Sequence, residues 1–171
     1  MIGEIVGAEG FSASSLFCKW GAVAGSQWVL LEGDEQGQTH VDVAEDGAPA
    51  VWAHPLDVHY LTKGLTGWPK LFFQVWSQDV HGRSDLAGYG FVHVPTAAGV
   101  HEVEVATWQP EGTVGERLSA ALVGGAPRLL QEELVYAAGD RYRLQTRSAG
   151  TVRLNLSVIF KDFDQHNISW S

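Results

Sequence analysis

The chain has 171 residues, of which 45% are hydrophobic and 18% charged, so we predict one domain (residues 1–163) with a short C-terminal tail (residues 164–171). Eleven Lys and Arg residues stand against 20 Asp and Glu residues, and the net charge of −9 disfavours nucleic acid and anionic lipid as partners. The single cysteine, Cys18, excludes an internal disulfide and suits a reducing compartment. Neither a signal peptide nor an apolar run long enough to span a bilayer is recognisable, so we expect a cytoplasmic protein.

Most of the chain reads as short alternating runs of apolar and polar residues, separated by Gly, Pro, Asp and Ser. Alternation with a period of two is typical of β-strands that bury one face. Such runs span residues 2–8, 16–22, 27–31, 39–43, 56–61, 71–78, 88–95, 101–107, 133–138 and 151–160. They predict an all-β fold, an antiparallel β-sandwich of about eight strands.

The faces of two strands follow from the alternation. In LFFQVWSQ, Leu71, Phe73 and Val75 share one face, and Phe72 and Trp76 lie on the other. In TVRLNLSVIF, the even-numbered apolar residues share a face, and Ser148–Gly150 separate this run from YRLQT. The separation predicts a C-terminal β-hairpin with its turn at Ser148–Gly150.

One segment, GTVGERLSAALVGG, departs from the strand pattern. Thr113 can cap a helix while Glu116 returns the hydrogen bond, and the glycine pair at 124–125 would end it. We therefore predict one short helix late in the domain.

Motifs for catalysis are scarce. The sequence has no G-x-S-x-G elbow, no Walker loop and no H-E-x-x-H pair, so we predict no catalytic residue and no cofactor. His54, Asp57 and His59 come nearest to a metal site, but only Asp57 and His59 share a strand face, which favours polar groups at a strand edge. Cys18 shares a face with apolar neighbours and is expected in the core.

Seven tryptophans are many for this length, and Trp is common both in cores and in binding hot spots. Trp68 lies in a connection flanked by Gly and Pro. The sequence leaves two roles for it open: filling the core, or contacting a partner. Phe72 and Trp76 are candidate partner contacts on the outer face of their strand. Phe11, in EGFSASS, either packs down or inserts into a membrane.

The stretch VWSQDVHGRSDLAGYG connects two predicted strands, and its order resembles the third calcium-binding loop of C2 domains. Asp79 and Asp85 match that pattern, whereas Ser77 and Ser15 stand where the pattern has aspartates. Calcium needs about six to eight oxygen ligands. Two carboxylates and two hydroxyls therefore predict a vestigial calcium loop without a bound metal.

A structural role for this loop follows from the same residues. Asp79 and Asp85 are expected to accept hydrogen bonds from amides two positions on, Gly82 to supply a permissive backbone angle, and Arg83 to neutralise one carboxylate. Without calcium, and with a net charge of −9, direct docking to acidic lipid is a secondary hypothesis.

A longer resemblance runs from about Ile2 to Phe163. It is carried by GFSASSLFCKWG, GQTHVD, WAHPLDVHY, KGLTGWPKLFFQVWSQDVHGRSDLAGYGFVHVP, ALVGGAPRLL and YRLQTRSAGTV. Together these segments resemble the B9-domain family, ciliary proteins with C2-like folds. The resemblance implies a non-enzymatic subunit of the Meckel syndrome complex at the ciliary transition zone and basal body, associated with the cytoskeleton. The implied partners are the first B9-domain protein and the larger Meckel syndrome B9 protein.

Two other functions stay open from the sequence. One is a monomeric C2-like module that binds lipid through loop aromatics or a residual calcium site. The other is an enzyme that uses His54, Asp57 and His59, which predicts stoichiometric zinc in the purified protein.

Overall fold

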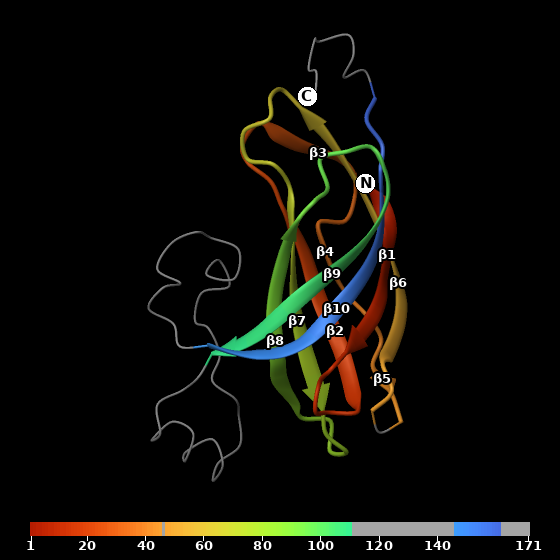
Figure 1. Ribbon diagram of the computed structural model, residues 1–171. Helices are drawn as coiled ribbons and strands as arrows, with labels where there is room; N and C mark the ends of the chain where they lie inside the picture. The colour runs from red at the N-terminus through yellow and green to blue at the C-terminus, as the bar shows by residue number, and fades with distance from the viewer. Residues whose placement is uncertain (46, 111–145, 162–171) are drawn as a thin grey trace.

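In the computed structural model, residues 1–45, 47–110 and 146–161 are described, and their regular elements are all β-strands (Figure 1). The strands are β1 (Ile2–Glu9), β2 (Ser15–Val23), β3 (Trp28–Gly33), β4 (Gln36–Gln38), β5 (Asp42–Val43), β6 (Ala50–Thr62), β7 (Lys70–Gln78), β8 (Ser84–His93), β9 (Gly99–Pro110) and β10 (Thr146–Val158). The predicted all-β class is confirmed. The predicted helix at residues 113–125 and the predicted strand at residues 133–138 lie outside the described residues.

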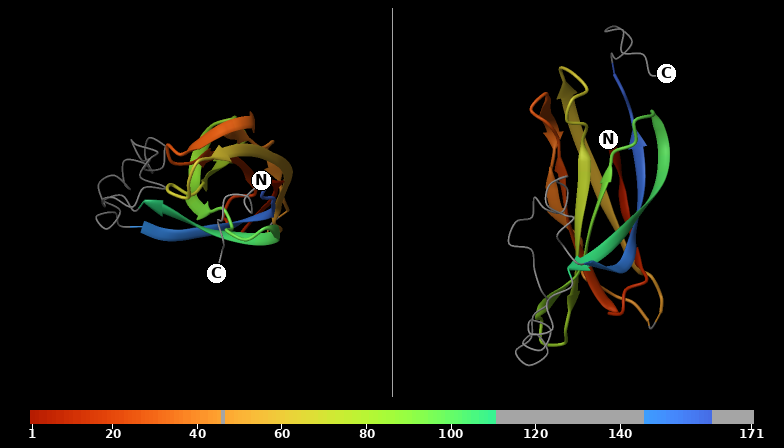
Figure 2. Two further views of the ribbon diagram at one scale, coloured as in Figure 1. Left: turned by 90° about the horizontal axis from the view of Figure 1, so that it is seen from above. Right: turned by 60° about the vertical axis from the view of Figure 1, so that its left-hand side comes forward.

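Every strand pair is antiparallel, and the pairs follow the order β3-β6-β1-β10-β9-β8-β7-β2-β4, with β5 paired to β2. A single register pair, Tyr89 with Trp108, joins β8 to β9, and we call the strands on either side of this junction the two layers of the curled sheet. Viewed along its long axis, the sheet curls around a closed outline (Figure 2). This curled antiparallel sheet is the predicted sandwich.

The core lies between the two layers and follows the predicted alternation. Leu71, Phe73 and Val75 of β7 are fully buried. The even-numbered residues of β10 from Val152 to Val158 are buried as well, opposite the polar side chains of Arg153 and its odd-numbered neighbours. Each large apolar side chain buried in this way contributes roughly 1.5–3 kcal/mol. Alternation therefore fixes which face of each strand meets the other layer.

Hydrogen bonds tie the two layers together where β6 approaches β2 and β5. The buried Trp52 indole of β6 donates to the carbonyl oxygen of Leu16 at 3.2 Å. Nearby, the Val51 amide donates to Asp42 Oδ2 at 2.9 Å. The layers are thus joined by directional bonds as well as by apolar contact.

The predicted C-terminal hairpin is wrong for the described part of that segment. Ser148–Gly150 lie inside β10, which continues from Thr146 to Val158 along β9. A register shift between Ser148 and Thr151 marks an irregularity of the bulge type instead of a turn. The hydroxyl of Thr107 donates to the carbonyl oxygen of Gly150 at 2.5 Å, and the Phe11 ring lies where a side chain at Gly150 would stand. Ser148–Gly150 are small because the chain packs closely at this point. A run of small residues is also typical of a turn, so the sequence alone does not distinguish the two.

Candidate interaction site

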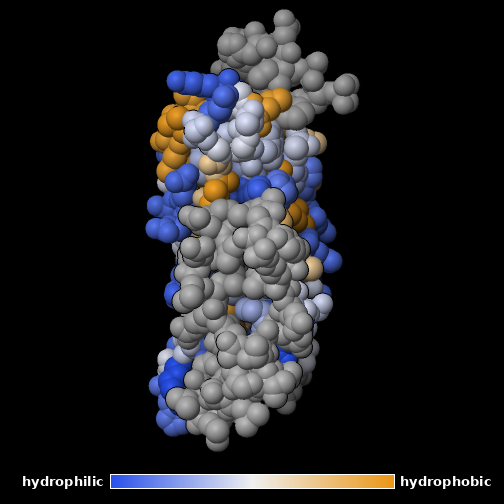
Figure 3. Space-filling view, turned by 90° about the vertical axis from the view of Figure 1, so that its left-hand side faces the viewer, coloured by the Kyte–Doolittle hydropathy of each residue, from blue (hydrophilic) through white to orange (hydrophobic). Residues whose placement is uncertain are grey.

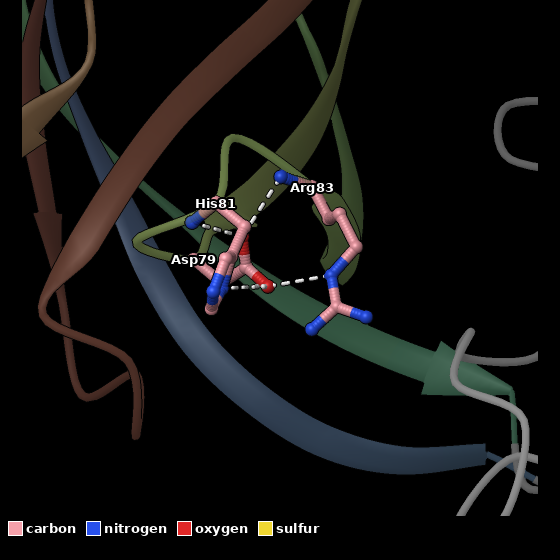
Figure 4. A network of polar contacts seen from close by, with 3 residues as sticks. All are labelled: Asp79, His81 and Arg83. Atoms are coloured by element: carbon pink, nitrogen blue, oxygen red, sulfur yellow. Dashed lines mark hydrogen bonds and ion pairs between the residues drawn. The ribbon is translucent and has the colours of Figure 1, made fainter.

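The loop between β7 and β8 is built around the carboxylate of Asp79 (Figure 4). Asp79 Oδ1 accepts hydrogen bonds from the His81 amide at 2.9 Å and the Arg83 amide at 2.8 Å. Asp79 Oδ2 accepts from Arg83 Nε at 2.7 Å. The Gly82 amide donates to the Asp79 carbonyl oxygen at 3.0 Å, with Gly82 at a φ of 79°. The predicted turn bond from Asp79, the positive φ at Gly82 and the pairing with Arg83 are confirmed.

These contacts favour the charged form of the carboxylate. The hydrogen bond from the Arg83 amide, followed by the bond from the Arg83 side chain, lowers the pKa of Asp79. Both carboxylate oxygens are engaged by donors of the protein itself. A cation at this position would have to compete with a guanidinium that already lies within hydrogen-bond distance.

The other three calcium-loop positions come from neighbouring strands at the same end of the sheet. Ser77 of β7 is the register partner of Asp85 on β8, and Ser77 Oγ donates to the Asp85 carbonyl oxygen at 3.2 Å. Ser15 opens β2, and its neighbour Leu16 is the register partner of Ser77. The two hydroxyls are therefore close to the loop in the fold. Among the residues that the structure describes, no three His, Cys, Asp or Glu side chains are placed to hold a metal ion.

His54, Asp57 and His59 do not converge. Asp57 Oδ1 lies 2.7 Å from His59 Nε2 on the outer face of β6. His54 is on the opposite face, with its ring edge-on to Trp20 at 6.1 Å between centroids, and burial lowers the pKa of its imidazole. The division of faces predicted from the sequence is thus confirmed.

An outer aromatic cluster covers the outside of β7 and β8. Its members are two buried residues and four half-buried ones, namely Leu86, Tyr89, Phe72, Trp76, Phe91 and Trp108. Trp76 stacks on Phe17 with 6.4 Å between centroids, and Lys19 Nζ lies 5.2 Å from the centre of its ring. Phe72 and Trp76 therefore face away from the main core, as predicted, but they are packed among other aromatic side chains.

Phe11 and Trp68 both pack against the main core. The Trp68 indole donates to the Val94 carbonyl oxygen at 2.7 Å. Its ring stands nearly perpendicular to Trp28 at 5.0 Å and contacts Phe160 at 6.2 Å. Trp68 thus joins the β3 end of the sandwich to the end of β10, in the position of a core plug.

Exposed apolar side chains that the sequence did not single out gather on β3 and the adjoining part of β6. Val29 is 48% exposed, Leu31 is 63% exposed, and Leu61, the register partner of Val29, is 50% exposed. Apolar groups are visible on the surface at the upper end of the molecule (Figure 3), the end at which Figure 1 places β3. The available signal was a run of four apolar residues, 28–31, that does not alternate.

Within the described residues, no helix has the length and apolar character that a membrane span requires. The model of the family named B9-C2, described as "Ciliary basal body-associated, B9 protein", matches residues 1–159. The chain belongs to this ciliary basal body-associated family.

The chain is 53% identical over 168 residues to B9 domain-containing protein 2 of Bos taurus, a match that covers 98% of this chain and 96% of the relative. It is 28% identical over 163 residues to B9 domain-containing protein 1 of Xenopus laevis, a match that covers 94% of this chain and 82% of that relative. Among solved structures, a C2 domain of plant Extended Synaptotagmin 1 matches 94% of this chain and 95% of its own length, with a TM-score of 0.45 and 12% identity.

Proposed function

We propose that this chain is a non-enzymatic structural subunit of the Meckel syndrome (B9) complex, which binds sister B9-domain proteins at the ciliary transition zone. Its partners would be the first B9-domain protein and the larger Meckel syndrome B9 protein, and the assembly would support ciliogenesis and the ciliary diffusion barrier. The family match carries the proposal, because residues 1–159, almost the whole chain, match the model of a ciliary basal body-associated family.

The geometry of the described residues supports a binding role over chemistry. Cys18 is fully buried, and burial raises the pKa of its thiol, which leaves it a poor nucleophile. The Asp79 carboxylate is engaged by Arg83 and by two backbone amides. The outside of the sandwich carries apolar side chains, which suit the binding of a protein partner.

The domain boundaries and contact residues belong to the same proposal. A single B9 domain would run from residue 1 to 163, with residues 164–171 as a tail. Phe72 and Trp76 stay candidate partner contacts because they lie on the outside of β7, where they form part of the outer aromatic cluster. Phe11 and Trp68 contribute to partner binding only indirectly, since both pack against the main core.

Co-expression with each expected partner tests this function. We expect affinity-tagged full-length chain to retain the first B9-domain protein and the larger Meckel syndrome B9 protein through a second purification step. An unrelated β-sandwich carrying the same tag serves as the control. If the chain retains neither partner, although circular dichroism shows that all three proteins are folded, the proposal is contradicted.

A second candidate is the lipid-binding module, and one residue favours it. Val80, in the β7–β8 loop, is 97% exposed. Burying one such side chain contributes roughly 1.5–3 kcal/mol, whereas even millimolar affinity needs about 4 kcal/mol, and the net charge of −9 opposes anionic membranes. Flotation with phosphatidylserine liposomes, with and without calcium, separates the two functions: strong calcium-dependent flotation would favour the lipid module.

A further inference from the structure

β3 lies at one end of the strand order, so one of its two edges is unpaired within the described part of the chain. Its partner on the paired side is β6, in a register that runs from Trp28 with Thr62 to Gly33 with Val58 and shifts between Leu30 and Glu32. An unpaired edge presents backbone amides and carbonyls in the spacing of another strand. The chemistry that matches such an edge best is an extended segment of another polypeptide.

The side chains on this edge strand are unusual for a free edge. Proteins commonly guard exposed edges with charged residues or proline, above all lysine. Here Val29, Leu30 and Leu31 follow one another and are all exposed, and Leu61 adds a further exposed apolar group on the neighbouring strand. Along residues 29–31, half of the six residues of β3, no charged side chain or proline guards the edge, although the register shift between Leu30 and Glu32 interrupts that run.

β3 is also held in place before any partner arrives. At its start, the Trp28 indole donates to the Thr66 carbonyl oxygen at 3.1 Å, and its ring contacts Tyr60 and Trp68. At its end, Gly33 has a φ of 92°, and a side chain there would overlap the backbone of Asp57. A strand fixed at both ends loses little conformational entropy on pairing, which favours association.

Charge distinguishes between two possible occupants of this edge. Glu32 and Asp34, both exposed, follow the apolar run directly. A second copy of the chain would bring another net charge of −9, which opposes self-association. A strand from a different chain, with apolar side chains and Lys or Arg near Glu32, complements both the apolar run and the charge.

We propose that the free edge of β3 is the place where a sister B9-domain protein adds a strand, through backbone hydrogen bonds and apolar contact with Val29 and Leu31. This inference rests on the proposed function and assigns a surface and a partner chemistry to it. The first B9-domain protein and the larger Meckel syndrome B9 protein are the probes.

The test uses the full-length chain and two variants. In V29K/L31K, lysines replace two exposed apolar residues, so the fold should persist. In V100K, lysine replaces a residue of β9 that is 79% exposed, which makes it the matched control away from the edge. We expect V29K/L31K to weaken binding of at least one partner by about tenfold or more, and V100K to stay within about twofold of the unmodified chain.

Hydrogen–deuterium exchange on the unmodified complex gives a readout that does not depend on any variant. Strand addition should slow exchange of the amides in residues 28–33, since pairing engages groups that water otherwise reaches. Unchanged exchange there, together with full binding by V29K/L31K, would overturn the edge inference while leaving the proposed function intact. If neither probe binds the unmodified chain, the proposed function fails and the inference fails with it. A homodimer that dissociates in V29K/L31K would also overturn the inference, because the occupant would then be a second copy.

Discussion

Arg83 and Asp79 form an ion pair within one tight loop, with 2.7 Å between Arg83 Nε and Asp79 Oδ2. The pair occupies the place where the sequence resembles a calcium-binding loop. A positive side chain four residues after the carboxylate therefore neutralises it and holds the β7–β8 turn through contacts of the protein itself.

This pairing predicts weak or no calcium binding. Titration calorimetry should show no saturable heat below roughly 1 mM calcium, because few oxygens are available and Asp79 is already engaged. R83Q, which removes the competing charge, should still bind no tighter than the millimolar range. A micromolar site in the unmodified chain that disappears in D79N would contradict the vestigial-loop interpretation.

The pH dependence of stability should carry a contribution from Asp79. Its pKa is lowered in the folded state, so the stabilisation is present above the unfolded value of about 3.9 and is lost as the pH falls through the folded value. The free energy of unfolding, measured by urea denaturation between about pH 5 and pH 2, should fall more steeply for the unmodified chain than for D79N. D85N, on β8 just after the loop, is the control and should keep the steeper fall. Identical slopes in all three proteins would argue against the Asp79 contacts.

The close contact between Gly21 and Phe72 gives a direct prediction about stability. They are register partners on β2 and β7, and a side chain at Gly21 would overlap the Phe72 ring. G21A should lower the free energy of unfolding by roughly 1–3 kcal/mol, since the added methyl group must displace the ring. The same substitution made in an F72A background should cost clearly less. Equal costs in the two backgrounds would show that Phe72 does not lie across Gly21.

Cys18 should be unreactive in the folded protein. It is fully buried on β2, and burial raises the pKa of its thiol, so little thiolate forms below strongly alkaline pH. Ellman's reagent should react at the rate of global unfolding and no faster, with rapid reaction in concentrated urea as the control. Immediate labelling of the native chain at pH 8 would contradict this placement.

The sequence predicted the core better than it predicted the edges of the fold. Alternation assigned Leu71, Phe73 and Val75 to the interior because a one-residue shift in a strand would expose all of them. The turn around Asp79 was also predictable, since its chemistry is local to a few residues. Both are cases in which neighbours in sequence decide the outcome.

Features that depend on distant neighbours were missed. Gly150 reads as part of a turn, yet it lies inside β10 beside Phe11, which is distant in sequence. Likewise, residues 29–31 read as an ordinary strand, because nothing in that run says that β3 lies at the end of the sheet. The convergence of Phe72, Trp76 and Trp108 on one outer cluster required strand order, which single-strand patterns do not contain.

Sedimentation velocity on purified full-length proteins tests the central claim most directly. The chain would be mixed at equal concentration with the first B9-domain protein and with the larger Meckel syndrome B9 protein, separately and together. We predict a faster-sedimenting species that contains the chain and at least one partner, at micromolar concentration and physiological salt. Three independently sedimenting folded proteins under those conditions would contradict the account.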